Sequence, residues 1–268
     1  MTEIVDVIIP YSSEYTEKYK LERAKESAKN QTVDVNLIIC ENDVGPAYGR
    51  NRGLERSKNR FVAFLDADDY WEEDKLEKQI KKLDETGSGL CLNKVRRGEE
   101  IIDPVRESEI EFIKDLLLCN ISSLTSSILI DSEKFQNRFD EEMYRFEDHL
   151  FIIETVNQSG ICFVNEILTT VEKHDNGLSS KTDQYKALNS RSKISKKIGD
   201  YYPSLKETAV RDLAQRHRWV GRDFYFNSDY KKSIELYKKS LSIKILPKTI
   251  AAYFLGTLKR NLNMKTIF

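Results

Sequence analysis

The chain has 268 residues, which is enough for one large domain or for one domain with a smaller appendage. Its 43 basic and 44 acidic residues give a formal net charge of -1, so a positive field that would attract nucleic acid is absent, and we expect no nucleic-acid partner. No apolar run approaches the ~20 residues that span a bilayer and the amino terminus has no secretory pattern, which together predict a cytoplasmic protein.

The first part of the chain alternates short apolar runs with polar, helix-prone segments. The first run ends at Pro10, residues 15–30 predict a helix, and a glycine-punctuated stretch occupies 45–53. A charged segment at 72–85 predicts a second helix. The apolar runs themselves predict strands at 5–9, 35–40 and 61–65. Continuous apolar strands between helices indicate an α/β fold, with a mixed, mostly parallel sheet covered by helices on both faces.

The middle of the chain has weaker patterns, and its end is helical. We expect further strands at 89–95 and 124–130, a helix at 146–158, and a hairpin made of 161–164 and 167–171. Beyond about residue 183 only helices are predicted, including one amphipathic helix at 228–241. The expected organisation is therefore a sheet-containing domain at 1–183 followed by a helical appendage at 184–268.

Three carboxylates stand together directly after the third predicted strand, at Asp66, Asp68 and Asp69. Carboxylates this close repel one another, and burying them without compensation is costly. A hard divalent cation, Mn²⁺ or Mg²⁺, resolves that repulsion and is usually held by one or two protein carboxylates and a substrate's phosphates. The alternative is a helix cap, since acids favour the first turn of a helix, but capping explains Asp69 alone.

Each of the first three predicted strands is followed directly by a proline or an acidic residue. Pro10, Glu41 and Asp66 occupy these three positions. In open α/β sheets the ligand site lies beyond the carboxyl ends of the strands. The pattern therefore predicts that these residues meet at one edge of the sheet.

Six sequence blocks, in order over residues 4–180, resemble the signature blocks of family 2 glycosyltransferases, which have the GT-A fold. The blocks are VDVIIPY at 5–11, NQT at 30–32, VGPAYGRNRGL at 44–54, FVAFLDADDYW at 61–71, FEDHLFIIETVNQSG at 146–160 and VEKHDNGLSS at 171–180. The resemblance implies an inverting enzyme of cell-surface glycan biosynthesis. It would move a sugar from a nucleotide-sugar donor, with a UDP-sugar favoured, to a hydroxyl of a glycan or lipid-linked glycan.

The resemblance also implies a donor site. Pro10, Tyr11 and Glu41 would line the nucleoside pocket, and Arg50 would lie near the donor diphosphate. Asp66 would approach the ribose or the sugar.

The same resemblance implies the metal site and the base. Asp68 would ligate Mn²⁺ or Mg²⁺, and His174 would help close the diphosphate or metal site. Asp148 would be the general base that takes the proton of the acceptor hydroxyl. Taken alone, Glu147 and Asp148 are equally consistent with ordinary first-turn acids, and a lone histidine such as His174 is more often an ordinary surface or hydrogen-bonded residue.

The chain departs from the family pattern around the nucleoside pocket. Only residues 42–44 separate Glu41 from Gly45, where the family usually has another helix and strand, so either Glu41 or Asp43 would contact the base. The family's Ala-Arg-Asn reads Gly49-Arg50-Asn51 here.

Two other functions compete with the transferase. A nucleotidyltransferase on a related sheet usually has a glycine-rich, basic loop after the first strand, whereas residues 11–15 here contain neither glycine nor a basic residue. A degenerate transferase-like interaction protein would explain the compressed nucleoside region.

The carboxy-terminal end is basic, because no acidic residue follows Glu235 while seven lysines and arginines do. Residues 244–268 mix this charge with apolar side chains. Such a segment is typical either of a helix packed on its domain or of a peripheral contact with anionic lipid at the inner face of the membrane.

Overall fold

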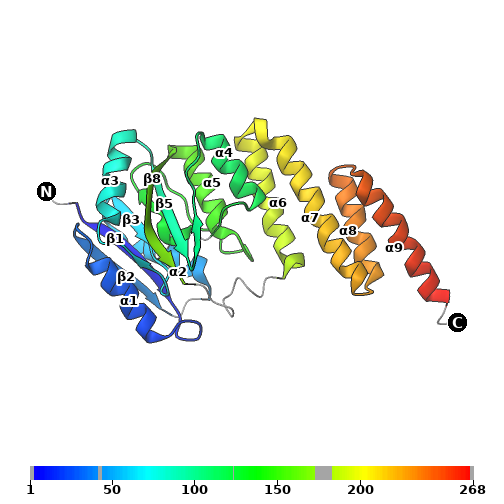
Figure 1. Ribbon diagram of the computed structural model, residues 1–268, viewed down its shortest axis with the longest axis horizontal. Coiled ribbons are helices and arrows are strands. Elements are labelled where there is room, and N and C mark those ends of the chain that lie inside the picture. Colours follow the sequence, from blue (N-terminus) through cyan, green and yellow to red (C-terminus); the bar gives the residue numbers. More distant parts are fainter. Residues whose placement is uncertain (1–2, 42–43, 123, 173–182, 266–268) are drawn as a thin grey trace. The chain divides into compact units, whose positions relative to one another are not determined.

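The computed structural model describes residues 3–41, 44–122, 124–172 and 183–265 (Figure 1). Two compact units are present, residues 1–181 and residues 182–268. The elements of the first unit are β1 (Val5–Tyr11), α1 (Lys18–Lys29), β2 (Val35–Glu41), α2 (Pro46–Arg56), β3 (Phe61–Phe64), β4 (Tyr70–Trp71), α3 (Lys75–Thr86), β5 (Leu90–Arg97), β6 (Glu100–Ile102), α4 (Glu109–Leu118), the 3₁₀ turn η1 (Thr125–Ser127), β7 (Leu129–Asp131), α5 (Glu147–Ser159) and β8 (Ile161–Val171).

The first unit is built on one mixed sheet, with the strand order β2-β1-β3-β7-β5-β8-β4 and β6 paired to β5. Strands β1, β2 and β3 are parallel, and β5 is parallel to β8, whereas β7 is antiparallel to both β3 and β5. The prediction of a mixed sheet in an α/β fold is therefore confirmed. Its parallel β1–β3 segment brings three strand ends to one edge.

Helices cover both faces of this sheet, as Figure 1 shows. Alternate residues of β1 and β3 point to opposite faces. One set packs in a core with α1 and α3, which includes Val7, Ala63 and Leu76. On the other face the ring of Phe64 packs edge-on against Phe151 of α5, at a centroid distance of 5.7 Å. The sheet is therefore a buried layer between two layers of helices.

Three local predictions are wrong. Strand β1 does not stop before Pro10 but continues to Tyr11, because Pro10 pairs with Cys40 of β2. The strand expected at 124–130 is instead the 3₁₀ turn η1 followed by β7, and the glycine-punctuated stretch, for which no element is predicted, is helix α2, with Pro46 in its first turn. The expected hairpin is the single strand β8, whose pairing with β5 shifts register around Asn93 and Lys94.

Close packing of α2 against β1 requires a glycine at position 53. A Cβ at this position would lie 2.3 Å from the side chain of Ile8 on β1. Only glycine lets the helix approach the strand this closely.

The second unit contains helices only, as the sequence predicts: α6 (Gln184–Tyr201), the 3₁₀ turn η2 (Pro203–Leu205), α7 (Lys206–Phe226), α8 (Tyr230–Ile243) and α9 (Pro247–Lys265). Leu188, Val220 and Leu236 form its small core, and a buried ion pair joins Arg191 to Asp212 at 3.1 Å. Over the residues that the structure covers, every helix is too short or too polar to cross a bilayer.

Candidate functional site

The carboxyl ends of β1, β2 and β3 form the edge at which the site lies. Tyr11 is in register with Glu41 across β1 and β2, and β3 runs parallel to β1 on its other side. Pro10 and Tyr11 are partly exposed and Glu41 is exposed. These residues and Asp66, which follows β3, therefore border one edge of the sheet, as their sequence positions predict.

Arg50 connects this edge to helix α5. Its Nη2 donates to Asp66 Oδ1 at 2.8 Å, and its Nη1 donates to Glu147 Oε1 at 3.1 Å. The side chain is 4% exposed and its guanidinium lies over the ring of Phe139, while no described residue forms a hydrogen bond with its Nε. Arg50 is thus a buried cation that holds two carboxylates from opposite sides of the site.

Helix α5 presents its first-turn acids, Glu147 and Asp148, to the site. The helix begins after Phe146, whose φ of 68° is rare for a bulky residue and marks a constrained turn. Asp148 is partly exposed, and its Oδ2 accepts a hydrogen bond from Thr125 Oγ1 at 3.4 Å. Its Oδ1 accepts from the backbone N–H of His149 at 2.8 Å. This places a carboxylate beside η1 at the start of a helix.

Asp69 is not a helix cap, because α3 begins at Lys75 and Asp69 precedes β4 instead. Its buried carboxylate accepts from Ser126 Oγ at 2.5 Å and from the backbone N–H of Glu172 at 3.2 Å. Ser126 Oγ in turn accepts from the backbone N–H of Asp66 at 3.0 Å. Asp69 therefore fixes the acidic loop against η1 and the end of β8.

Asp68 is held through its backbone. Arg23 of α1 donates from Nη2 to the carbonyl oxygen of Asp68 at 2.6 Å and from Nη1 to Glu172 Oε1 at 2.8 Å. The guanidinium also lies over the ring of Tyr70, 4.6 Å from its centroid. Lys20 adds a second cation, with its Nζ 2.9 Å from Glu172 Oε2. The side chain of Asp68 is partly exposed at the same place.

The charges of the site shift several pKa values. Burial raises the pKa of Asp69 well above its ordinary value, and the negative charges of Asp66 and Asp68 raise it further. Burial and the charge of Asp148 likewise raise the pKa of Glu147, against the opposing effect of Arg50. Burial alone would lower the pKa of Arg50, but Asp66 and Glu147 raise it. The site therefore has an excess of negative charge that a cation would stabilise.

The arrangement fits a divalent cation held jointly with a ligand. Asp66 is 34% exposed and Asp68 is partly exposed, so both carboxylates are accessible. Among the residues with described positions, no cluster of three or more histidine, cysteine or acidic side chains is arranged to hold a metal. One or two carboxylates that share a Mg²⁺ or Mn²⁺ ion with substrate phosphates would match these observations.

Most of the predicted site residues can be placed. Arg50, Asp66 and Asp148 belong to one network, whereas Pro10, Tyr11 and Glu41 lie along the strand edge. His174 and Asp43 lie outside the described residues. Sequence reasoning missed Arg23, Glu172 and Ser126. Glu172 lies in one of the quoted blocks, but nothing in the sequence around Ser126 distinguishes it.

Comparison with known proteins identifies the relatives of this site. Residues 12–152 match the sequence model of Glycosyl transferase family 2. The amylovoran biosynthesis glycosyltransferase AmsB of Erwinia amylovora is 30% identical over 157 residues, which are 54% of this chain and 52% of AmsB. The chain thus spans about half the length of this curated relative.

A second relative is named by its reaction. The UDP-Glc:alpha-D-GlcNAc-diphosphoundecaprenol beta-1,3-glucosyltransferase WfaP of Escherichia coli is 28% identical over 179 residues, 63% of this chain and 68% of WfaP. Among solved structures, residues 1–349 of S. aureus TarS in complex with UDP-GlcNAc superpose with a TM-score of 0.65 and 15% identity, covering 96% of this chain and 88% of that one. The likeness to TarS therefore shows a shared fold.

Proposed function

The chain belongs to glycosyl transferase family 2, and from this premise we propose that it is an inverting, metal-dependent enzyme that transfers a sugar from a UDP-sugar to a lipid-linked glycan. The family match places the chain among glycosyl transferases, and the likeness to TarS supports the GT-A fold. The proposal adds the donor, the metal, the stereochemistry and the acceptor. The observation that carries it is the network in which Arg50 joins Asp66 to the helix that presents Asp148.

We assign the donor to the edge formed by β1, β2 and β3. Pro10, Tyr11 and Glu41 would line the nucleoside pocket, and Asp66 would approach the ribose or the sugar. Support for a uridine nucleotide comes from WfaP, whose name specifies UDP-Glc, and from TarS, which was solved with UDP-GlcNAc. Asp43 remains the alternative to Glu41 as the contact to the base.

We assign the metal to Asp68, with His174 as a further ligand. When bound, Mn²⁺ or Mg²⁺ would act as a Lewis acid that stabilises the charge developing on the leaving diphosphate. Arg23 donates to the backbone carbonyl of Asp68. The hydrogen bonds of Asp69 with Ser126 and Glu172 hold the acidic loop in place. These contacts fix the position from which the Asp68 carboxylate acts, which preorganises the site before the donor arrives.

For Arg50 we propose a role that differs from the one its sequence position implies. Both of its Nη atoms are engaged with carboxylates and the side chain is 4% exposed. We therefore propose that Arg50 positions Asp66 and α5 rather than contacting the diphosphate directly. Its fixed positive charge still adds to the favourable field around the leaving group.

Asp148 is the residue we propose as general base. It is partly exposed, and Thr125 and the backbone of His149 orient its two oxygens. A carboxylate in this position can take the proton of an acceptor hydroxyl as that oxygen attacks the anomeric carbon. Attack opposite the leaving diphosphate inverts the anomeric centre. WfaP is named for a β-linked product from UDP-Glc, whose glucosyl group is α-linked, and that outcome is an inversion.

The acceptor would be a lipid-linked glycan at a membrane surface, as the name of WfaP suggests by analogy. Helix α9 is suited to approach that surface. Its side chains Ile250, Phe254, Leu258 and Leu262 repeat every four residues, so they share one face, and they are 39–66% exposed. The exposed Lys248 and Lys259 both lie on one side of this face, and neither has an ion-pair partner among the described side chains.

An apolar helical face with basic residues beside it binds anionic lipid headgroups and buries its side chains at the acyl boundary. We therefore propose that the enzyme is cytoplasmic and contacts the inner face of the membrane peripherally through α9. In this scheme residues 1–183 form the catalytic domain and residues 184–268 the appendage that brings it to its acceptor.

One reaction tests the proposed chemistry. The protein is incubated with UDP-glucose, Mn²⁺ and a GlcNAc-diphospholipid, and the anomeric coupling constant of any product is measured by NMR. A β-linked glucosyl product supports the proposal. An α-linked product would exclude inversion. Release of pyrophosphate from UTP and a sugar phosphate would instead support the nucleotidyltransferase, which membership of this family already disfavours.

A further inference from the structure

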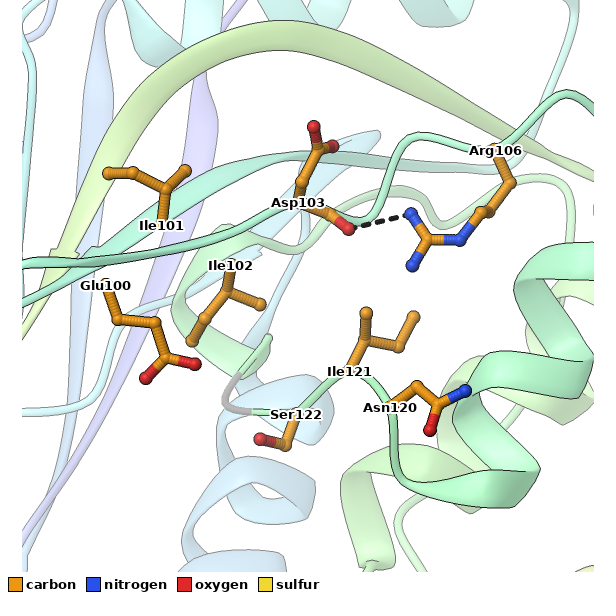
Figure 2. A pocket seen from close by; sticks show the side chains of 8 residues that line it. All are labelled: Glu100, Ile101, Ile102, Asp103, Arg106, Asn120, Ile121 and Ser122. Atoms are coloured by element: carbon orange, nitrogen blue, oxygen red, sulfur yellow. Dashed lines mark hydrogen bonds between the residues drawn. The ribbon is translucent and has the colours of Figure 1, made fainter.

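A pocket of about 300 Å³ has a lining that shares no residue with the strand edge that we assign to the donor (Figure 2). Its walls come from strand β6 and the segment after it, residues 100–103 and Arg106, and from residues 120–122, which follow α4. Ile102 and Ile121 are buried at 6% and 4% exposure, and polar side chains surround them. Most of the accessible lining is polar, so the pocket offers mainly hydrogen-bonding atoms to a small ligand.

The charged groups of this pocket already neutralise one another. Glu100 pairs with Arg97 at 2.7 Å, and Asp103 pairs with Lys94 at 2.7 Å. Arg106 pairs with Asp115 at 2.5 Å, and Figure 2 shows its guanidinium donating to the carbonyl oxygen of Asp103, at 2.9 Å. The walls therefore offer hydrogen-bonding atoms without a surplus of either charge. Such a pocket suits an uncharged ligand rather than a phosphate or a carboxylate.

Two further polar atoms in the wall have capacity for a ligand. Asn120 uses its Nδ2 to donate to Asp115 at 2.8 Å, and within the described part of the chain its Oδ1 is not engaged. The Ser122 hydroxyl likewise has no hydrogen bond to a described residue. A hydroxyl and an amide oxygen beside two isoleucine side chains match the hydroxyl groups and the apolar C–H face of a sugar ring.

Two paths connect the walls of the pocket to η1, whose Thr125 donates to Asp148. Ser122 precedes Thr125, the hydrogen-bond donor to Asp148, by three residues, so their Cα atoms are at most about 11 Å apart. On the other wall, Ile102 pairs with Val95, which pairs with Thr169. The hydroxyl of Thr169 reaches the carbonyl oxygen of Ser126 at 3.4 Å. Both walls are therefore connected to η1 by short paths, and η1 carries the residue that donates to Asp148.

We propose that this pocket, the 100–122 pocket, binds an uncharged monosaccharide ring of the acceptor glycan. The inference rests on the proposed transferase function, and it deepens that function by assigning a sugar subsite to named residues. An acceptor sugar held here would be positioned by its hydroxyl groups and its apolar face while its chain approaches Asp148.

The test uses saturation-transfer NMR with the full chain and a panel of methyl glycosides: methyl β-D-glucopyranoside, methyl β-D-galactopyranoside and methyl N-acetyl-α-D-glucosaminide. Glucose 6-phosphate is the charged comparison. Two variants, Ser122→Trp and Ile101→Trp, place a larger side chain at a lining residue of each wall. Ile101 is 41% exposed, so its substitution leaves the core intact. Ile110→Trp, at a 45% exposed position of α4 outside the pocket, is the matched control.

We expect at least one methyl glycoside to show saturation transfer with the natural chain and with Ile110→Trp, and the signal to fall at least fivefold in both pocket variants. Absence of binding to the natural chain, unchanged binding in the pocket variants, or a preference for glucose 6-phosphate would each overturn the proposal. UDP binding with Mn²⁺ is measured on the same samples. If the natural chain binds UDP but no methyl glycoside, only the proposal for the pocket fails. Absence of UDP binding contradicts the proposed function.

Discussion

Arg50 Nη2 lies 2.8 Å from Asp66 Oδ1 and joins helix α2 to the acidic loop after β3. The same guanidinium binds Glu147, so three segments far apart in sequence meet at one buried cation. The carboxylates that we assign to the donor and to the base therefore depend on a single side chain for their relative position.

We expect Arg50→Met to lower the free energy of unfolding by about 3 kcal/mol or more, because removing one partner of a buried ion pair leaves uncompensated charge. Transferase activity should fall with it, since Asp66 and α5 lose their common contact. Arg52→Met is the control, because Arg52 is exposed on the same helix and should change stability by less than about 1 kcal/mol. Urea denaturation measures both. Equal effects of the two substitutions would show that Arg50 does not hold the site.

Asp148→Asn should reduce transfer by about 10²–10⁴-fold, which is the usual contribution of a general base. The affinity for UDP and Mn²⁺ should stay unchanged, because Asp148 acts on the acceptor. Glu154→Gln, on the same helix, is the matched control and should retain activity. Turnover and nucleotide binding are measured separately. A variant that loses both together would place Asp148 in donor binding instead.

The strands of the donor edge could be predicted from the sequence because β1, β2 and β3 are continuous apolar runs. Helix α2 could not, since Gly49 and Gly53 lower helix propensity, and the reason for Gly53 is its contact with Ile8, a residue distant in sequence. The polar pair Asn165 and Glu166 imitates a turn, but both side chains are exposed in the middle of β8.

The acidic cluster shows the same limit for the site. The residue types and their spacing indicate a metal ligand at Asp68, whereas the role of Asp69 depends on burial and on its hydrogen bond from Ser126. The position of Ser126 is set by the packing of η1 between strands. A pattern along the chain carries no information about that packing.

Arg23→Met should weaken Mn²⁺ affinity by about 10–100-fold, which is typical when a group that orients a metal ligand is removed. Arg23 donates to the backbone of Asp68 and to Glu172, so its loss frees the loop without removing a carboxylate. Lys25→Met on the same helix is the control, because among the described residues the one ion pair of Lys25 is with Glu22 at the surface. Mn²⁺ titrations in the presence of UDP give both affinities. Unchanged affinity in Arg23→Met would remove Arg23 from the metal site.

The double variant Phe254→Asp with Leu258→Asp should lose at least tenfold in affinity for phosphatidylglycerol vesicles. Both side chains are more than half exposed on α9, and the change replaces apolar contact by repulsion from anionic lipid. Phe226→Asp, at a 73% exposed position of α7, is the control. Co-sedimentation at low and high salt measures binding. If the natural chain instead forms a dimer that the double variant abolishes, and neither binds vesicles, α9 is a self-association surface.

The central claim is that Asp68 and a divalent metal hold the diphosphate of a uridine nucleotide. The direct measurement is a thermal-shift panel of UDP, GDP, dTDP and CMP, with and without Mn²⁺, on the natural chain and on Asp68→Asn. A ligand at 100 times its Kd adds about 2.7 kcal/mol to the folded state, which corresponds to an increase in Tm of about 5–10 °C. We predict this increase for UDP with Mn²⁺ in the natural chain and its loss in Asp68→Asn. An equal increase without Mn²⁺ or in Asp68→Asn, or no increase with any nucleotide, would contradict the claim.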